Sequence, residues 1–147
     1  RAQKPLDLYN EDFWSAELSL RRLPGDTCST LMASHATDES MRHYVREMPI
    51  RYEDYEHSNV RKGPVIPYEG MRYPSSSYEM SYNMFYGYGD HKKAREAWLP
   101  YRARVVCADT PGAAYVFLFW SREEIFDGLL GSVDRALKSF EILKRKK

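Results

Sequence analysis

The fold is decided by residues 101–120, which read YRARVVCADTPGAAYVFLFW. Two β-rich runs, 101–108 and 113–120, flank the sequence DTPG at 109–112, which is a strong turn signal. This pattern predicts a β-hairpin. The second run is apolar almost throughout, so we expect a strand that is covered on both faces.

Downstream of the hairpin, the sequence predicts a long helix over residues 122–144. Ser121 and Glu124 have the spacing of a capping box. The apolar face of this helix consists of Ile125, Leu129, Val133, Ala136, Leu137, Phe140 and Leu143. Gly128 and Gly131 lower helix propensity, and we expect them to permit close approach to another backbone. With a short helix at 90–98, residues 90–147 are predicted to form a hairpin-helix core.

Residues 1–49 read as an N-terminal helical segment. Asn10 is a suitable N-cap for a helix over 10–23, and Pro24 followed by Gly25 would end it. A second helix is predicted over 37–47, with Pro49 after it. The predicted class is therefore α+β, with N-terminal helices, a C-terminal β-hairpin and a long helix.

Between these parts, residues 50–89 contain few aliphatic side chains and many tyrosines, prolines and glycines. Prolines and glycines interrupt helices and long strands. We interpret 50–89 as an extended, irregular Tyr-rich arm. Residues 58–89 are expected to order only on binding, because so few aliphatic groups cannot offset the entropy of ordering the backbone.

The arm carries the predicted binding residues. Its candidate protein-binding hot spots are Arg72, Tyr73, Tyr82, Phe85 and Tyr86. Tyrosine and arginine are enriched among residues that dominate interface energies, and this segment has no obvious internal core to fill. The chain has twelve tyrosines in 147 residues, which also favours an interaction protein.

Composition weighs against several other classes. The chain has 22 basic and 21 acidic residues, without the basic excess of a dedicated nucleic-acid binder. No apolar stretch approaches the roughly 20 residues of a spanning helix. The first residue is Arg1, which fits removal of an organellar presequence.

The sequence offers little for catalysis, and we expect a non-catalytic protein without metal or cofactor. The histidines lack the spacing of metal ligands. Cys28 and Cys107 are compatible with a disulfide or with two buried thiols, and we expect free thiols. A small enzyme using Cys28, or the glycine-rich loop 87–93 that runs from Gly87 to Lys93, is an alternative. That loop lacks both the third glycine of a dinucleotide fingerprint and the GK[ST] of a P-loop.

Residues 51–56 (RYEDYE), followed by 70–74 (GMRYP), resemble the ASHI accessory subunit of mitochondrial respiratory complex I. The resemblance implies an accessory subunit of a mitochondrial inner-membrane complex, bound to other protein subunits and associated with the membrane through them. That family has a membrane-spanning helix after this region, where the present chain has the predicted hairpin. A mitochondrial ribosomal protein, with the arm contacting rRNA, is the other alternative.

Overall fold

The computed structural model describes residues 16–34, 57–85 and 98–143 of the chain. These residues form six strands and two helices. The strands are β1 (Ala16–Pro24), β2 (His57–Lys62), β3 (Ile66–Pro67), β4 (Ser75–Phe85), β5 (Trp98–Thr110) and β6 (Ala113–Arg122). The helices are α2 (Cys28–Ser34) and α4 (Glu123–Lys138).

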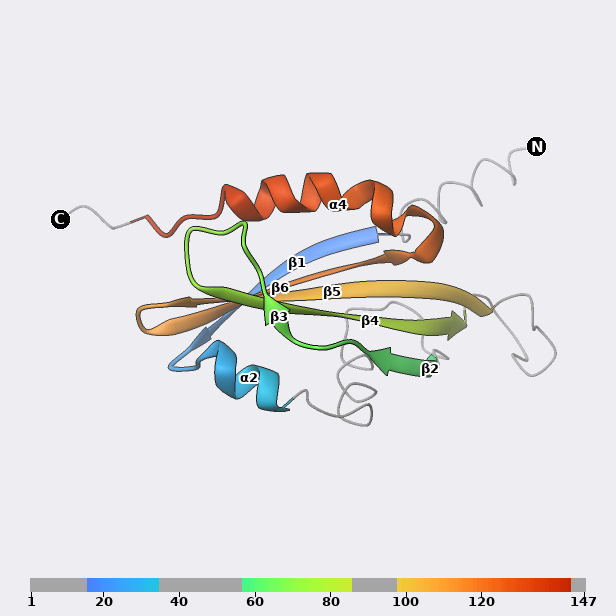
Figure 1. Cartoon of the computed structure of the whole chain (residues 1–147), viewed down its shortest axis with the longest axis horizontal. Coiled ribbons are helices and arrows are strands. Elements are labelled where there is room, and N and C mark those ends of the chain that lie inside the picture. The colour runs from blue at the N-terminus through green and yellow to red at the C-terminus, as the bar shows by residue number, and fades with distance from the viewer. Residues whose placement is uncertain (1–15, 35–56, 86–97, 144–147) are drawn as a thin grey trace, which may run out of the picture.

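The strands form a single antiparallel sheet in the order β1-β6-β5-β4-β2, and β3 also pairs with β4. Helix α4 lies across one face of the sheet and α2 lies against the other (Figure 1). The α+β class is confirmed. Within the described ranges, no helix is long and apolar enough to cross a membrane.

The central hairpin lies where the sequence predicts it, with strands two or more residues longer. Thr110 pairs with Ala113, so Pro111 and Gly112 alone form the connecting loop. Gly112 has φ 85°, a conformation that glycine adopts without steric cost. Strand β6 lies between β1 and β5, and the sheet is covered on both sides of it, as its apolar sequence predicts.

The predicted helix over 10–23 is wrong, because residues 16–24 form β1. Leu18 and Leu20 alternate with polar residues, and this two-residue period suits a strand. All nine residues of β1 pair with β6. An apolar strand such as β6 needs a neighbour on each side, and that long-range pairing overrides the local helical pattern. The helix predicted over 37–47 lies outside the described residues.

The predicted arm is also wrong, because residues 57–85 supply β2, β3 and β4. Tyr78, Met80 and Tyr82 alternate with polar side chains along β4, which pairs over its whole length with β5. The alternating tyrosines fill a core in place of aliphatic residues. The sheet thus joins parts of all three predicted regions, 1–49, 50–89 and 90–147.

Helix α2 is fixed to the sheet by a disulfide between Cys28 and Cys107, so the expectation of free thiols is wrong. Asp109 accepts a hydrogen bond from the backbone N–H of Cys28 at 2.8 Å. Thr27 accepts one from the N–H of Thr30 at the same helix end. The end of β5 therefore positions α2 both through the disulfide and through the hydrogen bond from Cys28 to Asp109.

Helix α4 spans Glu123–Lys138, so it ends at Lys138 and not at the predicted residue 144, and the predicted capping box is wrong. Ser121 is buried in β6 and donates a hydrogen bond to the carbonyl of Arg122. Arg122 occupies the N-cap position without a side-chain cap bond. A Cβ added at Gly128 would meet nothing within 4 Å, so this glycine does not serve a close approach within the described fold.

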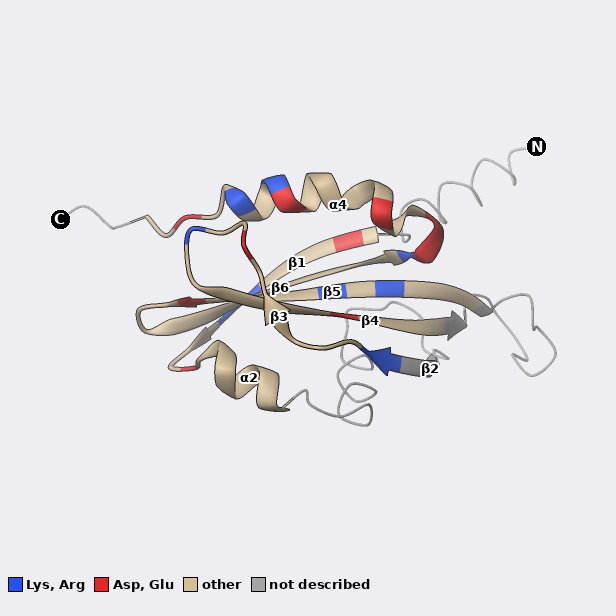
Figure 2. Cartoon of the chain, in the orientation of Figure 1, with Lys and Arg blue, Asp and Glu red and all other residues tan. Residues whose placement is uncertain are grey.

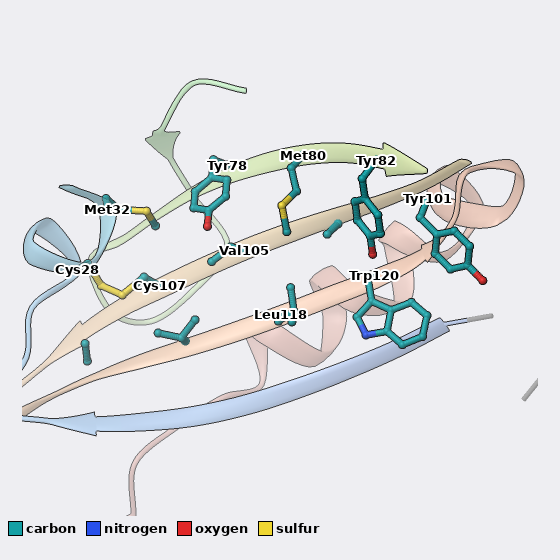
Figure 3. Packing of buried hydrophobic residues seen from close by; sticks show 13 residues of the cluster. Cys28, Met32, Tyr78, Met80, Tyr82, Tyr101, Val105, Cys107, Leu118 and Trp120 are labelled. Atoms are coloured by element: carbon teal, nitrogen blue, oxygen red, sulfur yellow. A yellow bond between two sulfur atoms is a disulfide. The ribbon is translucent and has the colours of Figure 1, made fainter. Parts of the chain in front are cut away.

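Two hydrophobic clusters lie on opposite faces of the sheet. The α4 face buries Val106, Phe117, Phe119, Phe126, Val133 and Leu137. The α2 face buries a cluster rich in aromatic and sulfur-containing side chains, which includes the disulfide (Figure 3). In Figure 3, Tyr82, Tyr101 and Trp120 gather at one end of that face, and Cys28, Met32 and Cys107 at the other.

Candidate functional site

A surface pocket of about 720 Å³ lies between the segment that joins β2 to β4 and the second half of α4. We call it the α4 pocket. Its lining residues are Gly63, Pro64, Ile66, Pro67, Tyr68, Glu69, Gly70, Ser77, Tyr78, Glu79, Arg104, Asp134, Arg135 and Lys138. The pocket thus combines an irregular loop, two strands and a helix that are far apart in the sequence.

The shape of the loop side comes from its glycine and prolines. The N–H of Gly63 bonds the carbonyl of Glu79 at 2.7 Å, and a Cβ at Gly63 would lie 3.2 Å from that oxygen. Glycine therefore permits this close approach of two backbones. Pro64 and Pro67 remove two donors at the edge of the sheet, so after β2 the strand pairing of this segment with β4 is limited to the two residues of β3.

The polar wall of the pocket is organised around Glu79. One carboxylate oxygen accepts hydrogen bonds from Nε and Nη2 of Arg104, at 3.0 and 2.6 Å. The other accepts one from Nη2 of Arg102 at 2.7 Å. Opposite strand positions bring these groups together, because Glu79 pairs with Arg104 and the side chain of Arg102 points to the same face.

Two acidic residues of α4 extend this network. Asp127 accepts a bond from Arg102 at 3.1 Å, and Asp134 accepts one from Arg104 at 3.4 Å. The hydroxyl of Tyr68 also donates to Asp134, which connects the loop to the helix. The result is a continuous chain of charged groups beneath α4, where Figure 2 shows basic positions on β5.

The protonation states follow from these contacts. Burial alone would raise the pKa of Glu79, but the hydrogen bonds and charges of Arg104 and Arg102 outweigh it and lower that pKa. Burial raises the pKa of the Tyr68 hydroxyl, and its bond to Asp134 raises it further. Glu79 is therefore ionised and Tyr68 neutral near pH 7, and each is held by a partner.

The rest of the pocket is apolar on the loop side and basic on the helix side. Pro64, Ile66 and Pro67 contribute the apolar lining. The apolar surface continues beyond the pocket at Val65, which is 41% exposed and adjoins the lining residue Ile66, itself 53% exposed. Of the described residues, none forms an ion pair with Arg135 or Lys138; Arg135 donates a hydrogen bond to Ser132 at 3.0 Å.

The predicted binding residues do not form one surface. Tyr82 is 3% exposed and stacks on Tyr101, so it belongs to the core. Tyr73 is half-buried and packs edge-on against Phe140. Its hydroxyl accepts a hydrogen bond from the N–H of Ile142. The premise that these tyrosines have no internal contacts is wrong, because strand β5 and the chain after α4 provide them.

The other three predicted residues contribute little to a common site. Arg72 is exposed and pairs with Glu141 at 3.8 Å. Phe85 ends β4, opposite Trp98 of β5, and its side chain lies outside the described atoms. Tyr86 lies outside the described residues.

The two catalytic sites that the sequence offered as alternatives are Cys28 and the loop from Gly87 to Lys93. Cys28 is 3% exposed and oxidised in the disulfide, so it offers no thiolate for nucleophilic attack. The loop from Gly87 to Lys93 lies outside the described residues. Among the residues that are described, no group of three His, Cys, Asp or Glu side chains could hold a metal.

Sequence reasoning missed the residues that build the α4 pocket. One signal was present in the sequence: Arg102 and Arg104 alternate with apolar residues at the start of β5. Two arginines on one face of a half-buried strand require acidic partners. Those partners, Glu79 and Asp134, come from two other elements and cannot be found by local spacing.

Comparisons with known proteins give a distant likeness in fold. No protein-family model and no curated protein matches the chain. A solved structure that is similar is the solution structure of cyanobacterial PsbP (CyanoP) from Synechocystis sp. PCC 6803, with a TM-score of 0.38 and 14% sequence identity. The match covers 84% of this chain and 64% of that one, so the chain spans less than two thirds of the PsbP chain.

The predicted membership in the complex I accessory subunits is wrong, and so are the mitochondrial location and the respiratory function that it implied. The similar structure is a PsbP, and no match to that subunit family was found. Physically, the second half of the resemblance, residues 70–74, leads directly into β4. It lies in the loop between β3 and β4 of a folded domain and not in a Tyr-rich arm.

Proposed function

We propose that this chain is a non-catalytic binding domain whose α4 pocket receives an apolar side chain from an acidic segment of a partner protein. The observation that carries the proposal is the pocket itself. It is apolar on its loop side, open onto further apolar surface at Val65 and Ile66, and bordered by the basic residues Arg135 and Lys138.

The polar groups of the pocket favour binding over catalysis. A general base or nucleophile must be free to reach a substrate. Glu79 is held by two arginines, and Asp134 by Arg104 and Tyr68. Groups fixed in this way form a rigid wall, which lowers the cost of ordering on binding.

The exposed apolar surface favours a protein partner over a small molecule. Small-molecule sites enclose most of their ligand. Here Val65 is exposed outside the pocket, next to the exposed lining residue Ile66, so an occupant that covered both would extend beyond the pocket. An extended peptide segment satisfies this geometry, with one side chain in the pocket and its neighbours on β3.

The basic residues favour an acidic segment. Arg135 and Lys138 lie in the last turn of α4, where cations also complement the helix dipole. Glu69 lies on the loop side of the same pocket. A peptide carboxylate would therefore be attracted to the helix side and repelled from the loop side, which fixes its direction across the pocket.

The disulfide supports a location in an oxidising compartment. Such bonds form and persist in secreted, periplasmic or lumenal proteins and are rare where thiols are kept reduced. Cys28 and Cys107 are the two cysteines of the chain, and they are joined. We infer that the partner is encountered in such an environment.

Selection from a random peptide library on the immobilised chain tests the proposal. We expect enriched peptides to carry an apolar or aromatic residue within a few positions of Asp or Glu. Ile66→Asp and Lys138→Glu should each weaken binding of a selected peptide at least tenfold. Leu20→Asp is the matched control, because Leu20 has almost the same exposure (52%) but lies on β1.

The outcome that overturns the proposal is equally specific. Peptides that bind Ile66→Asp and Leu20→Asp equally well do not use the pocket. If the enriched peptides lack acidic residues, the basic wall of the pocket, formed by Arg135 and Lys138, does not contribute to peptide recognition. Circular dichroism melts of all variants establish that each is folded before binding is compared.

A further inference from the structure

The two edges of the sheet differ in the features that prevent pairing with another strand. Among the described strands, β1 lies at one edge of the sheet and β2 at the other (Figure 1). The edge beside β4 is interrupted by Pro64 and Pro67 and by a shift of register within β2. Strand β1 pairs with β6 without a shift over nine residues, and its one proline is the last residue, Pro24. Long regular edges of this kind are templates for a further strand.

The direction of the backbone groups along β1 can be assigned. Beyond the last pair of the ladder, the N–H of Gly25 bonds the carbonyl of Gly112 at 2.9 Å. Opposite residues alternate in antiparallel sheets, so Leu23, Arg21, Ser19 and Glu17 also direct their backbone groups toward β6. Leu18, Leu20 and Pro24 direct theirs outward. Pro24 fits this assignment, because it has no N–H to donate to β6.

The side chains of β1 add an apolar surface next to that edge. Leu18 and Leu20 lie opposite Phe119 and Phe117, so they point to the α4 face. They are 40% and 52% exposed. Beside them, a groove of about 260 Å³ runs between β1 and α4; its lining residues are Ala16, Glu17, Leu18, Phe119, Leu129, Ser132 and Val133.

We propose that β1 pairs with β1 of a second copy of this chain, antiparallel across a two-fold axis at Ser19. In this register, Leu18 lies opposite Leu20 of the other copy, and the outward backbone groups of both residues form the hydrogen-bonded pairs. The two-fold axis repeats each contact, so the four leucines cover one another on the α4 face.

Charge complementarity selects this register. With Ser19 at the axis, Glu17 lies opposite Arg21 of the second copy, and the symmetry gives two such pairs on the face opposite α4. An axis at Leu18 would put Glu17 opposite Ser19, and an axis at Leu20 would put it opposite Leu23. Opposite charges directly across an antiparallel pair are stabilising. The indole N–H of Trp120 donates to Glu17 at 3.1 Å and holds its carboxylate on that face.

The first experiment measures association of the full chain by sedimentation equilibrium. We expect a concentration-dependent dimer that Arg21→Glu weakens at least tenfold, because Glu17 would then face a like charge. The double variant Glu17→Arg/Arg21→Glu should restore the dissociation constant to within about threefold. Leu20→Asp should also weaken the dimer, and Ile66→Asp, matched in exposure, should not.

The second experiment traps the register. In a non-hydrogen-bonded antiparallel pair, the two Cα atoms are about 4.5 Å apart, within reach of a disulfide. Ser19→Cys should therefore form a covalent dimer under mild oxidation, and Ser34→Cys, exposed on α2, should not. A wild-type chain that stays monomeric at millimolar concentration overturns the proposal. The proposal is also overturned by a dimer whose dissociation constant is unchanged by Arg21→Glu and which does not cross-link through Ser19→Cys.

Discussion

Strand β4 presents different kinds of side chain to the two faces of the sheet. Toward α2, Tyr78, Met80 and Tyr82 of β4 are all buried, and the Cys28–Cys107 disulfide closes one end of the cluster. Toward α4, the neighbouring positions of β4 are polar, and Glu79 is satisfied by arginines of β5. Because side chains alternate across a strand, one short sequence supplies an apolar core and a charged wall at once.

Along β4, this difference assigns the stabilising interactions to the side chains of the α2 face and the binding surface to those of the α4 face, while the apolar cluster of the α4 face is supplied by β5, β6 and α4. Buried apolar and aromatic groups contribute most of the stability of a domain, and partly exposed ion pairs contribute less. The α4 pocket can therefore vary in its apolar and basic lining at small cost to the fold. Substitutions that compare the two faces test this assignment.

The largest effect is expected for Tyr82→Ala on the α2 face. Removal of a large, fully buried aromatic ring leaves a cavity, and the expected loss of unfolding free energy is about 3–5 kcal/mol. Urea denaturation measures it, with Tyr82→Phe as the control that keeps the ring. A loss below about 1 kcal/mol would contradict the core position of Tyr82 and favour the sequence-based prediction that it binds a partner.

Opening the disulfide should have the next largest effect. The bond joins residues separated by 79 positions, and it restricts the unfolded chain accordingly. We expect the Cys28→Ser/Cys107→Ser variant to lose about 2–4 kcal/mol of unfolding free energy. Wild type with a reducing agent should approach the stability of that variant, and the variant itself should not respond to the agent. Equal stability of the oxidised and reduced proteins would contradict a structural role.

The hairpin and α4 were predictable because their signals are local. The turn sequence, the apolar run of β6 and the helical period after it lie within some 40 consecutive residues. Strand β1 was not predictable, since its choice between helix and strand depends on pairing with β6, about 100 residues away. In β4, the alternation of Tyr78, Met80 and Tyr82 with polar residues was visible, but the scarcity of aliphatic residues suggested an arm.

The site was less predictable than the fold, since it depends on register. Glu79 meets Arg104 because two strands pair with those residues opposite each other. Asp134 meets Arg104 because α4 crosses back over the same strand. Neither contact can be inferred from the spacing of these residues in the sequence.

A smaller effect is expected for Glu79→Gln on the α4 face. The variant leaves Arg102 and Arg104 with Asp127 and Asp134 as partners, so we expect a loss of about 1–2 kcal/mol, between the values for exposed and buried pairs. Asp127→Asn, which affects one exposed partner, should cost less.

The same glutamate gives a pH dependence. Its pKa is lower in the folded chain than in the unfolded chain. The stabilisation is therefore complete above the unfolded pKa of about 4.5 and is lost as the pH falls through the folded value. The unfolding free energy of wild type should drop more steeply below about pH 4.5 than that of Glu79→Gln. Parallel curves would mean that other carboxylates dominate acid unfolding.

The smallest effect on stability is expected at Lys138. It is exposed at the end of α4 and forms no ion pair with a described residue, so Lys138→Ala should change the unfolding free energy by less than about 0.5 kcal/mol. Binding of a selected acidic peptide should nevertheless weaken severalfold, and Lys138→Arg should retain it. If Lys138→Ala loses about 1 kcal/mol at low ionic strength while peptide binding is unchanged, Lys138 serves the helix dipole alone. The basic wall of the pocket would then depend on Arg135, and the direction of the bound peptide would have to be derived from that residue and Glu69.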